Sequence, residues 1–477
     1  MIFVDKDLSK FCINFALKNG ASFAEARIVS STSDSFMLKN GTPVVSQFLE
    51  DSGVGIRVLV NGAMSFVSAN SFNRDLLKDK IKRAIKFAMS SANTKKEKIE
   101  FEGFKFAKTK WEVKGKRKIE DVSPKEKMDF LFDIEKNLKD LKSKVPSRFF
   151  QLNTETSETF YANSEGAEIS SRIPRVMLYY SVVVSEGNQS EQRYFQFGES
   201  GGWEMIKKWK AEEKIREEAK VLLNLIRKAK SFNTEAVDVI LSPELVGIAM
   251  HESCGHPYEA DRILGREGAQ AGESFIKEEM MGTRIGSDAV TVVDDPLVPN
   301  NFGYYEYDDE GVKARRRFLI KDGIITEFLH NRETAVKMRT ESNAAARASS
   351  YNREPIIRMS NTFMLPGNYS FDEIIEEIKK GVYIKSFTEW NIDDKRWNQK
   401  YVGSESYFIE NGELKGLVRR PVLEITTKDF FSAVDACGKD VGFVPGSCGK
   451  GDPMQGIPVW MGGPHIRLRN VVVSKYA

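Results

Sequence analysis

The segment EAVDVILSPELVGIAMHESCGHPYEADRILG, residues 235–265, contains the change of pattern on which the fold prediction depends. Its first seven residues are typical of a strand, and Ser242 and Pro243 then suit the N-cap and the first position of a helix. That helix has an apolar face formed by Leu245, Val246, Ala249 and Met250. Gly255 and Pro257 are expected to end it, because the residue before a proline is pushed out of the α region.

Upstream of this segment the sequence predicts both helices and strands. Amphipathic patterns predict helices at residues 8–19, 73–92, 124–142 and 203–230. Alternating apolar runs separated by Gly or Asn turns predict a small sheet between residues 24 and 70, and further strands are expected at 149–196. This half of the chain is therefore interpreted as an α/β domain with a mixed sheet and helices.

The pattern changes at the polar joint Ser231–Thr234, after which Gly and Pro become frequent and long helices rare, apart from one expected at 371–380. A chain of 477 residues is too long for one ordinary core. We therefore predict an α+β fold with two domains. An N-terminal α/β domain covers residues 1–230, and a β-rich C-terminal domain that carries the chemistry covers residues 231–477.

Composition excludes several classes of protein. Lys and Arg number 71 against 68 Asp and Glu, and a net charge of +3 over this length argues against a nucleic-acid partner. No stretch approaches the roughly 18 apolar residues of a membrane span, and Asp5, Lys6 and Asp7 interrupt any signal peptide. Four cysteines are too few for a disulfide scaffold. We expect a cytoplasmic protein without a membrane partner.

One basic segment, Lys95–Lys118, also contains Phe101, Phe104, Phe106 and Trp111. Such a pattern can bind single-stranded nucleic acid by stacking. Interspersed glutamates dilute its charge, so a solvated connector whose aromatic residues pack onto the domain is the favoured interpretation.

The chemistry is expected at His251, Glu252 and His256. In the arrangement H-E-x-x-H the histidines are four residues apart and about 40° apart around a helix, whereas a spacing of five gives about 140°. Gly255 and Pro257 are predicted to release His256 from helical geometry, so that both imidazoles can bind one metal ion. Glu252 can then act as the general base toward a water molecule.

A catalytic zinc commonly has three protein ligands, which leaves the third to be identified. Cys254 lies close in sequence, and Cys448 lies in the glycine-rich loop PGSCGKGDPMQGIPV. Periodicity does not decide between them, although a buried thiol is the commoner fate of a cysteine among helical core positions. The other histidines, His330 and His465, are assigned structural or surface roles.

HESCGH resembles the HExxxH motif of the TldD/PmbA family, and GSCGKGDPMQGIPV resembles that family's C-terminal cysteine loop. The resemblance continues through FGYYEYDDEGVKARRRFLIKDGIITEFLHNRETA and SGVGIRVLVNGAMSFVSA. It implies a zinc-dependent peptidase with His251, His256 and Cys448 as zinc ligands and Glu252 as catalytic acid/base. By the same resemblance, Cys254 is not a ligand.

The resemblance also implies an enclosed cavity that admits short or unfolded peptides. It implies a homodimer, or a heterodimer with a PmbA/TldE-like chain. Residues 387–406, FTEWNIDDKRWNQKYVGSES, are bulkier and more charged than the family pattern and are candidates to line the substrate path. Arg347, Tyr351 and Arg358 are candidates to stabilise an oxyanion, although each residue type more often serves packing.

Two other functions are compatible with the sequence. The first is a zinc amidohydrolase that acts on small molecules with the same metal site. The second is a non-catalytic regulator or scaffold, in line with the family's older link to DNA gyrase modulation. Cleavage of simple amides but not of peptides would favour the first, and absence of zinc would favour the second.

Overall fold

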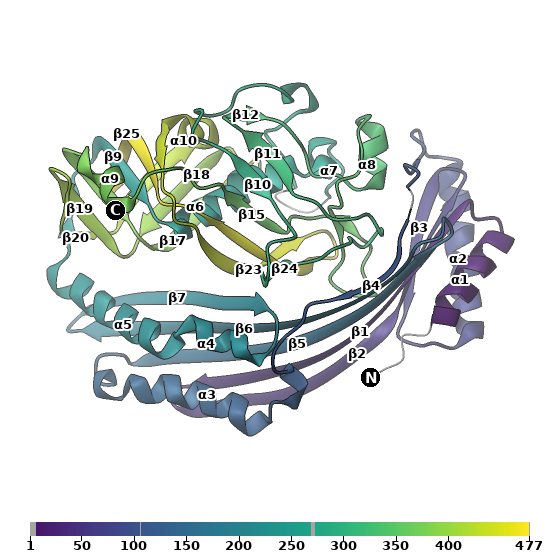
Figure 1. Cartoon of the computed structure of the whole chain (residues 1–477), viewed down its shortest axis with the longest axis horizontal. Coiled ribbons are helices and arrows are strands. Elements are labelled where there is room, and N and C mark those ends of the chain that lie inside the picture. The colour runs from purple at the N-terminus through teal and green to yellow at the C-terminus, as the bar shows by residue number, and fades with distance from the viewer. Residues whose placement is uncertain (1–5, 105, 269–271, 477) are drawn as a thin grey trace.

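The computed structural model of the chain describes residues 6–104, 106–268 and 272–476, and its first half is built on one long, curved sheet (Figure 1). Within these ranges the strand order is β3-β2-β1-β5-β6-β4, with β7 paired to β6. The strands are β1 Phe23–Lys39, β2 Thr42–Val60, β3 Ala63–Ala69, β4 Lys108–Glu112, β5 Ser147–Asn163, β6 Glu168–Glu186 and β7 Gln189–Ser200. Because β4 pairs with β6 in parallel while the other pairs are antiparallel, the predicted mixed sheet is confirmed.

The sheet is larger than predicted. The runs AEARIVSST and DSFMLKN belong to one strand, β1, which pairs with β2 through its whole length. Alternation of apolar and polar residues is interrupted along these strands because the centre of β1 is half-buried on both faces and the first half of β2 is mostly exposed. The periodicity of the sequence therefore predicted two short strands where the structure has one long strand.

Helices cover the two ends of this sheet (Figure 1). They are α1 Lys6–Lys18, α2 Arg74–Ala92, α3 Pro124–Asn137, α4 Ile206–Trp209 and α5 Ala211–Lys228. The stripe predicted for α2 is buried, and the Asn73 side chain caps that helix. The helix predicted at 203–230 is broken at Lys210, whose left-handed backbone (φ 49°) separates α4 from α5. The helix predicted at 124–142 ends at Asn137 and is followed by the short turn η2 (Lys139–Leu141).

The second half is rich in short strands, which confirms the α+β fold class. In the described part of the chain one sheet has ten strands, in the order β17-β18-β21-β25-β9-β16-β19-β20-β8 with β22 beside β25. Its strands are β8 Lys230–Ser231, β9 Glu235–Leu241, β16 Lys380–Ile384, β17 Phe387–Ile392, β18 Asn398–Gly403, β19 Ser406–Glu410, β20 Glu413–Arg419, β21 Pro421–Thr426, β22 Val434–Cys437 and β25 Ile466–Lys475.

A second sheet in this half has the order β12-β11-β10-β15-β24-β23. Its strands are β10 Val292–Asp294, β11 Arg317–Lys321, β12 Ile324–Ile325, β15 Asn361–Met364, β23 Gly442–Lys450 and β24 Gln455–Gly463; a separate pair is β13 Ala346–Arg347 and β14 Ile356–Ile357. The helices are α6 Pro243–Met250, α7 Ala260–Ile263, α8 Arg332–Lys337, α9 Phe371–Glu376 and α10 Thr427–Ala433. Helix α9 is shorter than the predicted 371–380 because β16 begins at Lys380.

Helix α6 connects the two C-terminal sheets. It follows β9, near the centre of the ten-stranded sheet, and packs on β15, β23 and β24 of the other sheet. Gly247 allows this close approach, since a Cβ there would lie 3.0 Å from the backbone nitrogen of Gly462. The end of α6 is thereby held against the strand pair β23–β24.

The aromatic residues of the basic segment pack onto the protein, as predicted. Phe101, Phe104 and Phe106 surround the guanidinium of the buried Arg332, at 4.9, 5.9 and 5.1 Å from their ring centroids. Each interaction combines apolar burial with a cation–π contact. These half-buried rings are therefore engaged with Arg332.

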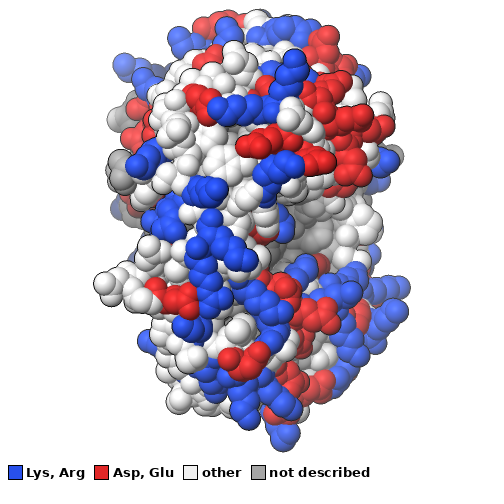
Figure 2. Space-filling view, turned by 90° about the vertical axis from the view of Figure 1, so that its left-hand side faces the viewer, with Lys and Arg blue, Asp and Glu red and all other residues white. Residues whose placement is uncertain are grey.

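The surface charges are mixed. On the face shown in Figure 2, Lys and Arg adjoin Asp and Glu, and the surface is hollowed between its upper and lower parts. Near β8 and β20, Arg227 pairs with Glu186 at 2.6 Å and Arg420 pairs with Glu191 at 2.8 Å. No helix within the described ranges is both long and apolar enough to cross a membrane.

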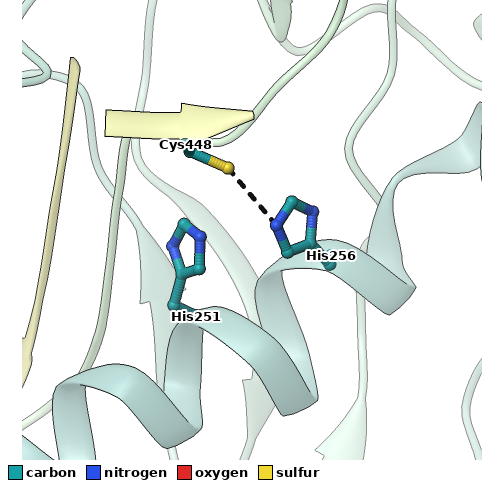
Figure 3. Close-up of side chains that lie close together, drawn as sticks. All are labelled: His251, His256 and Cys448. Atoms are coloured by element: carbon teal, nitrogen blue, oxygen red, sulfur yellow. Dashed lines mark hydrogen bonds between the residues drawn. The ribbon is translucent and has the colours of Figure 1, made fainter. Parts of the chain in front are cut away.

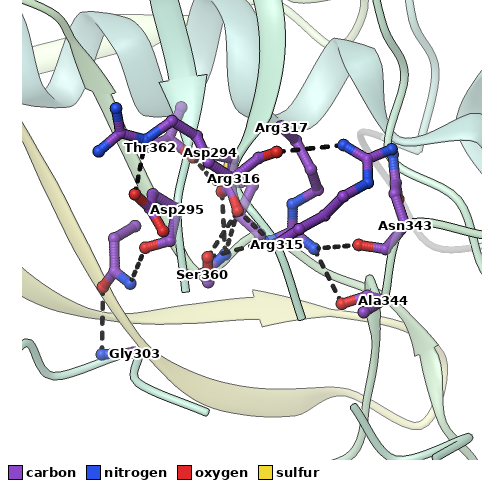
Figure 4. A network of polar contacts seen from close by, with 12 residues as sticks. Asp294, Asp295, Gly303, Arg315, Arg316, Arg317, Asn343, Ala344, Ser360 and Thr362 are labelled. Atoms are coloured by element: carbon purple, nitrogen blue, oxygen red, sulfur yellow. Dashed lines mark hydrogen bonds and ion pairs between the residues drawn. The ribbon is translucent and has the colours of Figure 1, made fainter. Parts of the chain in front are cut away.

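A buried ionic network stabilises the six-stranded sheet (Figure 4). Arg317 pairs with Asp294, and both side chains are fully buried. The Arg317 guanidinium also donates to the Asn343 carbonyl at 3.0 Å, while Asp294 accepts from the hydroxyls of Ser360 and Thr362 at 2.5 and 2.7 Å. Burial acts to raise the pKa of Asp294, but Arg317 and these hydrogen bonds lower it below its ordinary value.

Replacing Asp294 with Ala should lower the free energy of unfolding by about 3–5 kcal/mol, because the Arg317 charge would remain buried without its partner. Urea unfolding followed by circular dichroism measures this loss. Asp288→Ala is the control, since Asp288 forms a largely exposed pair with Arg284 and its removal should change stability little. Equal effects of the two substitutions would contradict this interpretation.

Candidate metal site

The two histidines of the HESCGH segment lie in a helical turn that is wider than an α-helical one. Helix α6 begins at Ser242, whose hydroxyl accepts the backbone N–H of Glu244 at 3.2 Å. After Met250 the chain continues as the π-helical turn η4 (His251–Gly255), and the N–H of His256 donates to the carbonyl of His251. This i→i+5 bond adds one residue to the turn. The imidazoles consequently approach each other, with ring centroids 4.8 Å apart.

The prediction that Gly255 and Pro257 release His256 from helical geometry is wrong. Both Gly255 (φ −55°, ψ −63°) and His256 (φ −61°, ψ −47°) remain helical, and the segment continues as the 3-10 turn η5 (His256–Tyr258) before extended backbone at Glu259. Gly255 has a packing role instead. A Cβ at this position would lie 1.8 Å from the sulfur of Met359.

Cys448 completes a three-residue cluster with His251 and His256 (Figure 3). It lies on β23 opposite Ile457 of β24, and its Sγ is 3.3 Å from Nε2 of His256. One ligand atom from each of the three residues lies within 4.8 Å of the others, and all three side chains are buried. Figure 3 shows both imidazoles projecting from the same side of the helical segment toward the strand of Cys448.

Cys254 is not part of this three-residue cluster, although it lies in the same hydrophobic core of the C-terminal half as Cys448. It is fully buried, and burial raises the pKa of its thiol well above the ordinary value. A thiol with so high a pKa stays neutral. Cys254 is also not among the residues whose ligand atoms lie close together in the metal-site cluster. The structure thus brings Cys448, and not Cys254, to the histidines.

The cluster fits a zinc ion by its donor chemistry. Two imidazole nitrogens and one thiolate are ligands that zinc prefers, with one position left open. Burial lowers the pKa of His251 and of His256, which favours the neutral imidazoles that bind metals. Burial acts to raise the pKa of Cys448, but His256 lowers it below its ordinary value. Nδ1 of His251 is buried without a hydrogen-bond partner, which leaves a donor atom available.

The orientation of His256 is fixed by a carboxylate that the sequence analysis did not identify. Oε2 of the fully buried Glu259 lies 3.2 Å from Nδ1 of His256, which leaves Nε2 facing Cys448. The same oxygen accepts from Arg262 at 2.6 Å and lies 3.2 Å from Nζ of the buried Lys450. Carboxylates that hold a ligating histidine in this way increase metal affinity. The i,i+3 spacing from His256 was the available sequence signal.

Lys450 connects the two segments that carry the cluster. It follows Cys448 by two residues on β23, and its ammonium contacts Asp261 at 2.7 Å and the carbonyl of Ile357 at 2.9 Å. A buried ammonium with several oxygen partners is well satisfied. This contact ties the strand of Cys448 to the turn that follows His256.

Glu252 lines the same cavity as the cluster and is ion-paired. Its Oε2 accepts from Nη1 of Arg396 at 2.6 Å. Sequence analysis did not identify Arg396, although it lies within the divergent stretch 387–406. The contact between Arg396 and Glu252 joins residues far apart in the sequence and is visible only in the folded structure.

The cavity has a volume of about 420 Å³ and receives residues from both halves of the chain. Its walls are mainly aromatic and aliphatic, with polar groups near the histidines. Beside the cluster, Glu252 and Arg396, the lining consists of Tyr179, Tyr194, Phe195, Gln196, Glu244, Ile248, Phe387, Trp390, Val444, Gly446, Ser447, Gly449, Val459 and Met461. Phe387, Trp390 and Arg396 belong to the divergent stretch, which therefore lines the cavity as expected.

The three candidates for oxyanion stabilisation lie outside the lining of this cavity. Arg347 donates to the carbonyls of Met359 and Pro458 at 2.7 and 3.0 Å. Arg358 is fully buried and donates to the carbonyl of Cys448. Tyr351 packs against the glycines of β2. The arginines therefore position backbone, including that of Cys448.

The remaining histidines lie apart from the cluster, in line with the roles expected for them. His330 is buried, its Nδ1 is 3.2 Å from the hydroxyl of Thr334, and burial lowers its pKa to about 4. His465 is held by Asp440 at 2.6 Å and by the Tyr383 hydroxyl at 3.0 Å. Both side chains thus have structural partners.

Sequence models of one known family match nearly the whole chain. Residues 24–92 match the PmbA/TldA metallopeptidase domain 1, residues 117–230 match the central domain, and residues 234–475 match the C-terminal domain. The third match contains every residue of the cluster and Glu252.

Several named proteins are similar along their full length. The metalloprotease MJ0996 of Methanocaldococcus jannaschii is 33% identical, over 93% of this chain and 95% of its own. The zinc metalloprotease TldD homolog of Saccharolobus solfataricus is 27% identical, over 96% and 97%. The solved structure of TldE from Thermococcus kodakarensis matches with a TM-score of 0.78 at 18% identity, over 98% of this chain and 100% of that one, which shows a shared fold.

Replacing Gly255 with Ala should lower the free energy of unfolding by about 1–3 kcal/mol and reduce bound metal, because the added methyl collides with Met359. Urea unfolding and elemental analysis measure the two effects. Gly416→Ala is the control, since a Cβ there meets nothing within 4 Å. Met359→Ala should offset part of the loss in the double variant, and strictly additive losses would contradict the proposed collision.

Proposed function

Because this chain belongs to the PmbA/TldA metallopeptidase family, we propose that it is a zinc-dependent peptidase that hydrolyses short or unfolded peptides inside its cavity. His251, His256 and Cys448 would hold the zinc, and Glu252 would be the general base. The observation that carries this proposal is the approach of three buried ligand atoms to within 4.8 Å in the cavity that Glu252 also lines.

Tetrahedral zinc with bonds of 2.0–2.3 Å places its ligand atoms roughly 3.5 Å apart. The 3.3 Å between Cys448 and His256 already agrees with this value. The larger separations in the cluster would close by small side-chain rotations. Zinc, when bound, would polarise the scissile carbonyl and make water more acidic.

The protein's own residues supply the proton transfers. Glu252 would take a proton from the attacking water and return it to the leaving amine, which restores the carboxylate for the next turnover. Glu259 would keep Nδ1 of His256 protonated and its Nε2 directed toward Cys448. The buried position of the site reduces the contact of Glu252 and the two histidines with bulk solvent.

The size and lining of the cavity also favour one class of substrate. A volume of about 420 Å³ admits a few residues of peptide and excludes a folded protein. Tyr179, Tyr194 and Phe195 from the N-terminal sheet and Phe387 and Trp390 from β17 would contact apolar side chains. Peptides with large apolar residues beside the scissile bond are therefore the proposed substrates.

We further propose a domain boundary between residues 230 and 231 and an assembly with a second chain. The boundary is supported by the family matches, which end at 230 and resume at 234. A homodimer, or a heterodimer with a PmbA/TldE-like chain, is supported by the fold shared with TldE. Tyr179, Tyr194 and Phe195 precede the boundary, so the substrate site would use both domains.

Glu252→Gln should lower kcat for an apolar peptide by about 100-fold or more while zinc content stays unchanged, because the amide cannot accept the proton. A fluorogenic peptide panel and elemental analysis measure both quantities. The exposed Glu424 provides the control, and Glu424→Gln should behave as the wild type.

Retained activity in Glu252→Gln would contradict the mechanism. Cleavage of simple amides with no cleavage of any peptide would instead favour a zinc amidohydrolase. Absence of zinc from the wild type would favour a non-catalytic regulator or scaffold. Among solved structures of similar fold, a Bacteroides thetaiotaomicron protein is described as a candidate modulator of DNA gyrase, with a TM-score of 0.77 at 18% identity.

A further inference from the structure

Arg396 reaches the cavity from the tip of the hairpin formed by β17 and β18. The tip is a tight turn in which the N–H of Arg396 donates to the Asp393 carbonyl at 3.0 Å. Arg396 has a left-handed backbone with φ 65°. This conformation is uncommon for residues other than glycine and is retained where surrounding contacts impose it.

Contacts on both sides of Arg396 hold the turn in place. The Asp393 carboxylate accepts the backbone N–H of Trp397 at 2.8 Å and that of Asn398 at 3.1 Å. The hydroxyl of Thr427 donates to the Arg396 carbonyl at 2.8 Å. The Trp397 ring packs edge-on against Phe275, with centroids 5.1 Å apart. The turn is therefore fixed to the body of the domain, and the direction of the Arg396 side chain is fixed with it.

The guanidinium of Arg396 contacts the carboxylate of Glu252, the candidate general base. Nη1 lies 2.6 Å from Oε2 of Glu252, and the two side chains are only 12% and 7% exposed. Among the residues that the structure describes, no other cation forms an ion pair with Glu252. Charge-assisted hydrogen bonds of this kind are short, strong and directional.

We propose that Arg396 is a positioning residue that holds the Glu252 carboxylate in the orientation needed for proton transfer. The inference rests on the function proposed above. A glutamate side chain has three rotatable bonds, and a contact that fixes one carboxylate oxygen restrains the orientation of the whole carboxylate. General-base catalysis depends on such orientation as well as on basicity. An arginine suits this role because its guanidinium stays protonated and its planar donors fix direction.

The test compares Arg396→Ala, Arg396→Lys and the control Lys395→Ala in the full-length protein. Lys395 precedes Arg396 in the same turn, but its side chain is 66% exposed. Arg396→Ala should lower kcat by about 10- to 100-fold, as expected for loss of a charge-assisted hydrogen bond, with KM changed less than about twofold. Arg396→Lys should recover part of kcat, and Lys395→Ala should equal the wild type. Zinc content should be retained in all three, and the midpoint of thermal unfolding should be retained in Lys395→Ala.

A second comparison separates positioning from a general structural effect. In a Glu252→Asp background the shorter carboxylate cannot make the same contact, so adding Arg396→Ala should cost less than about twofold in kcat. A crystal structure of Arg396→Ala should also show the Glu252 side chain in more than one orientation.

Three outcomes would overturn the assignment. The first is full activity of Arg396→Ala, and the second is a raised KM with unchanged kcat, which would make Arg396 a substrate-binding group. The third is an equal loss in the wild-type and Glu252→Asp backgrounds. If Glu252→Gln abolishes hydrolysis while Arg396→Ala does not reduce it, the proposed function stands and the role of Arg396 fails. If Glu252→Gln remains active, the proposed function itself fails.

Discussion

The hydrogen bond from the N–H of His256 to the carbonyl of His251 is the contact on which the candidate metal site depends. Histidines five residues apart diverge on an α-helix by about 140°. The π-helical turn removes most of this divergence and keeps the backbone helical. Gly255 lies within this turn and makes room for Met359, which packs where a Cβ would be. The placement of the two histidines and the packing of the core therefore both depend on this turn.

The surrounding fold brings the other groups to this turn. Strand β23 supplies Cys448, Lys450 ties that strand to Asp261, and Arg358 holds the Cys448 carbonyl. The β17–β18 hairpin supplies Arg396, and the long N-terminal sheet adds aromatic residues from β6 and β7. Each group comes from a strand or from a turn fixed by hydrogen bonds. A site built from rigid elements in this way is well ordered before substrate binds.

The sequence predicted the α+β class, the helix after Ser242 and the set of candidate ligands, because these depend on local patterns. It did not predict the π-helical turn, or the packing of Met359 against Gly255, which joins residues that are remote in the chain. Periodicity left Cys254 and Cys448 undecided, and only the resemblance favoured Cys448. Glu259 and Arg396 were missed because their roles arise from tertiary ion pairs, and acidic and basic residues are frequent everywhere in this chain.

The central claim is that one zinc ion binds between His251, His256 and Cys448. Crystals of the purified protein, with anomalous diffraction recorded on both sides of the zinc absorption edge, test it most directly. We expect a single zinc peak at about 2.0–2.1 Å from a nitrogen of each imidazole and about 2.3 Å from Sγ of Cys448. A peak beside Cys254, or none at this cluster in protein purified without chelator, would contradict it.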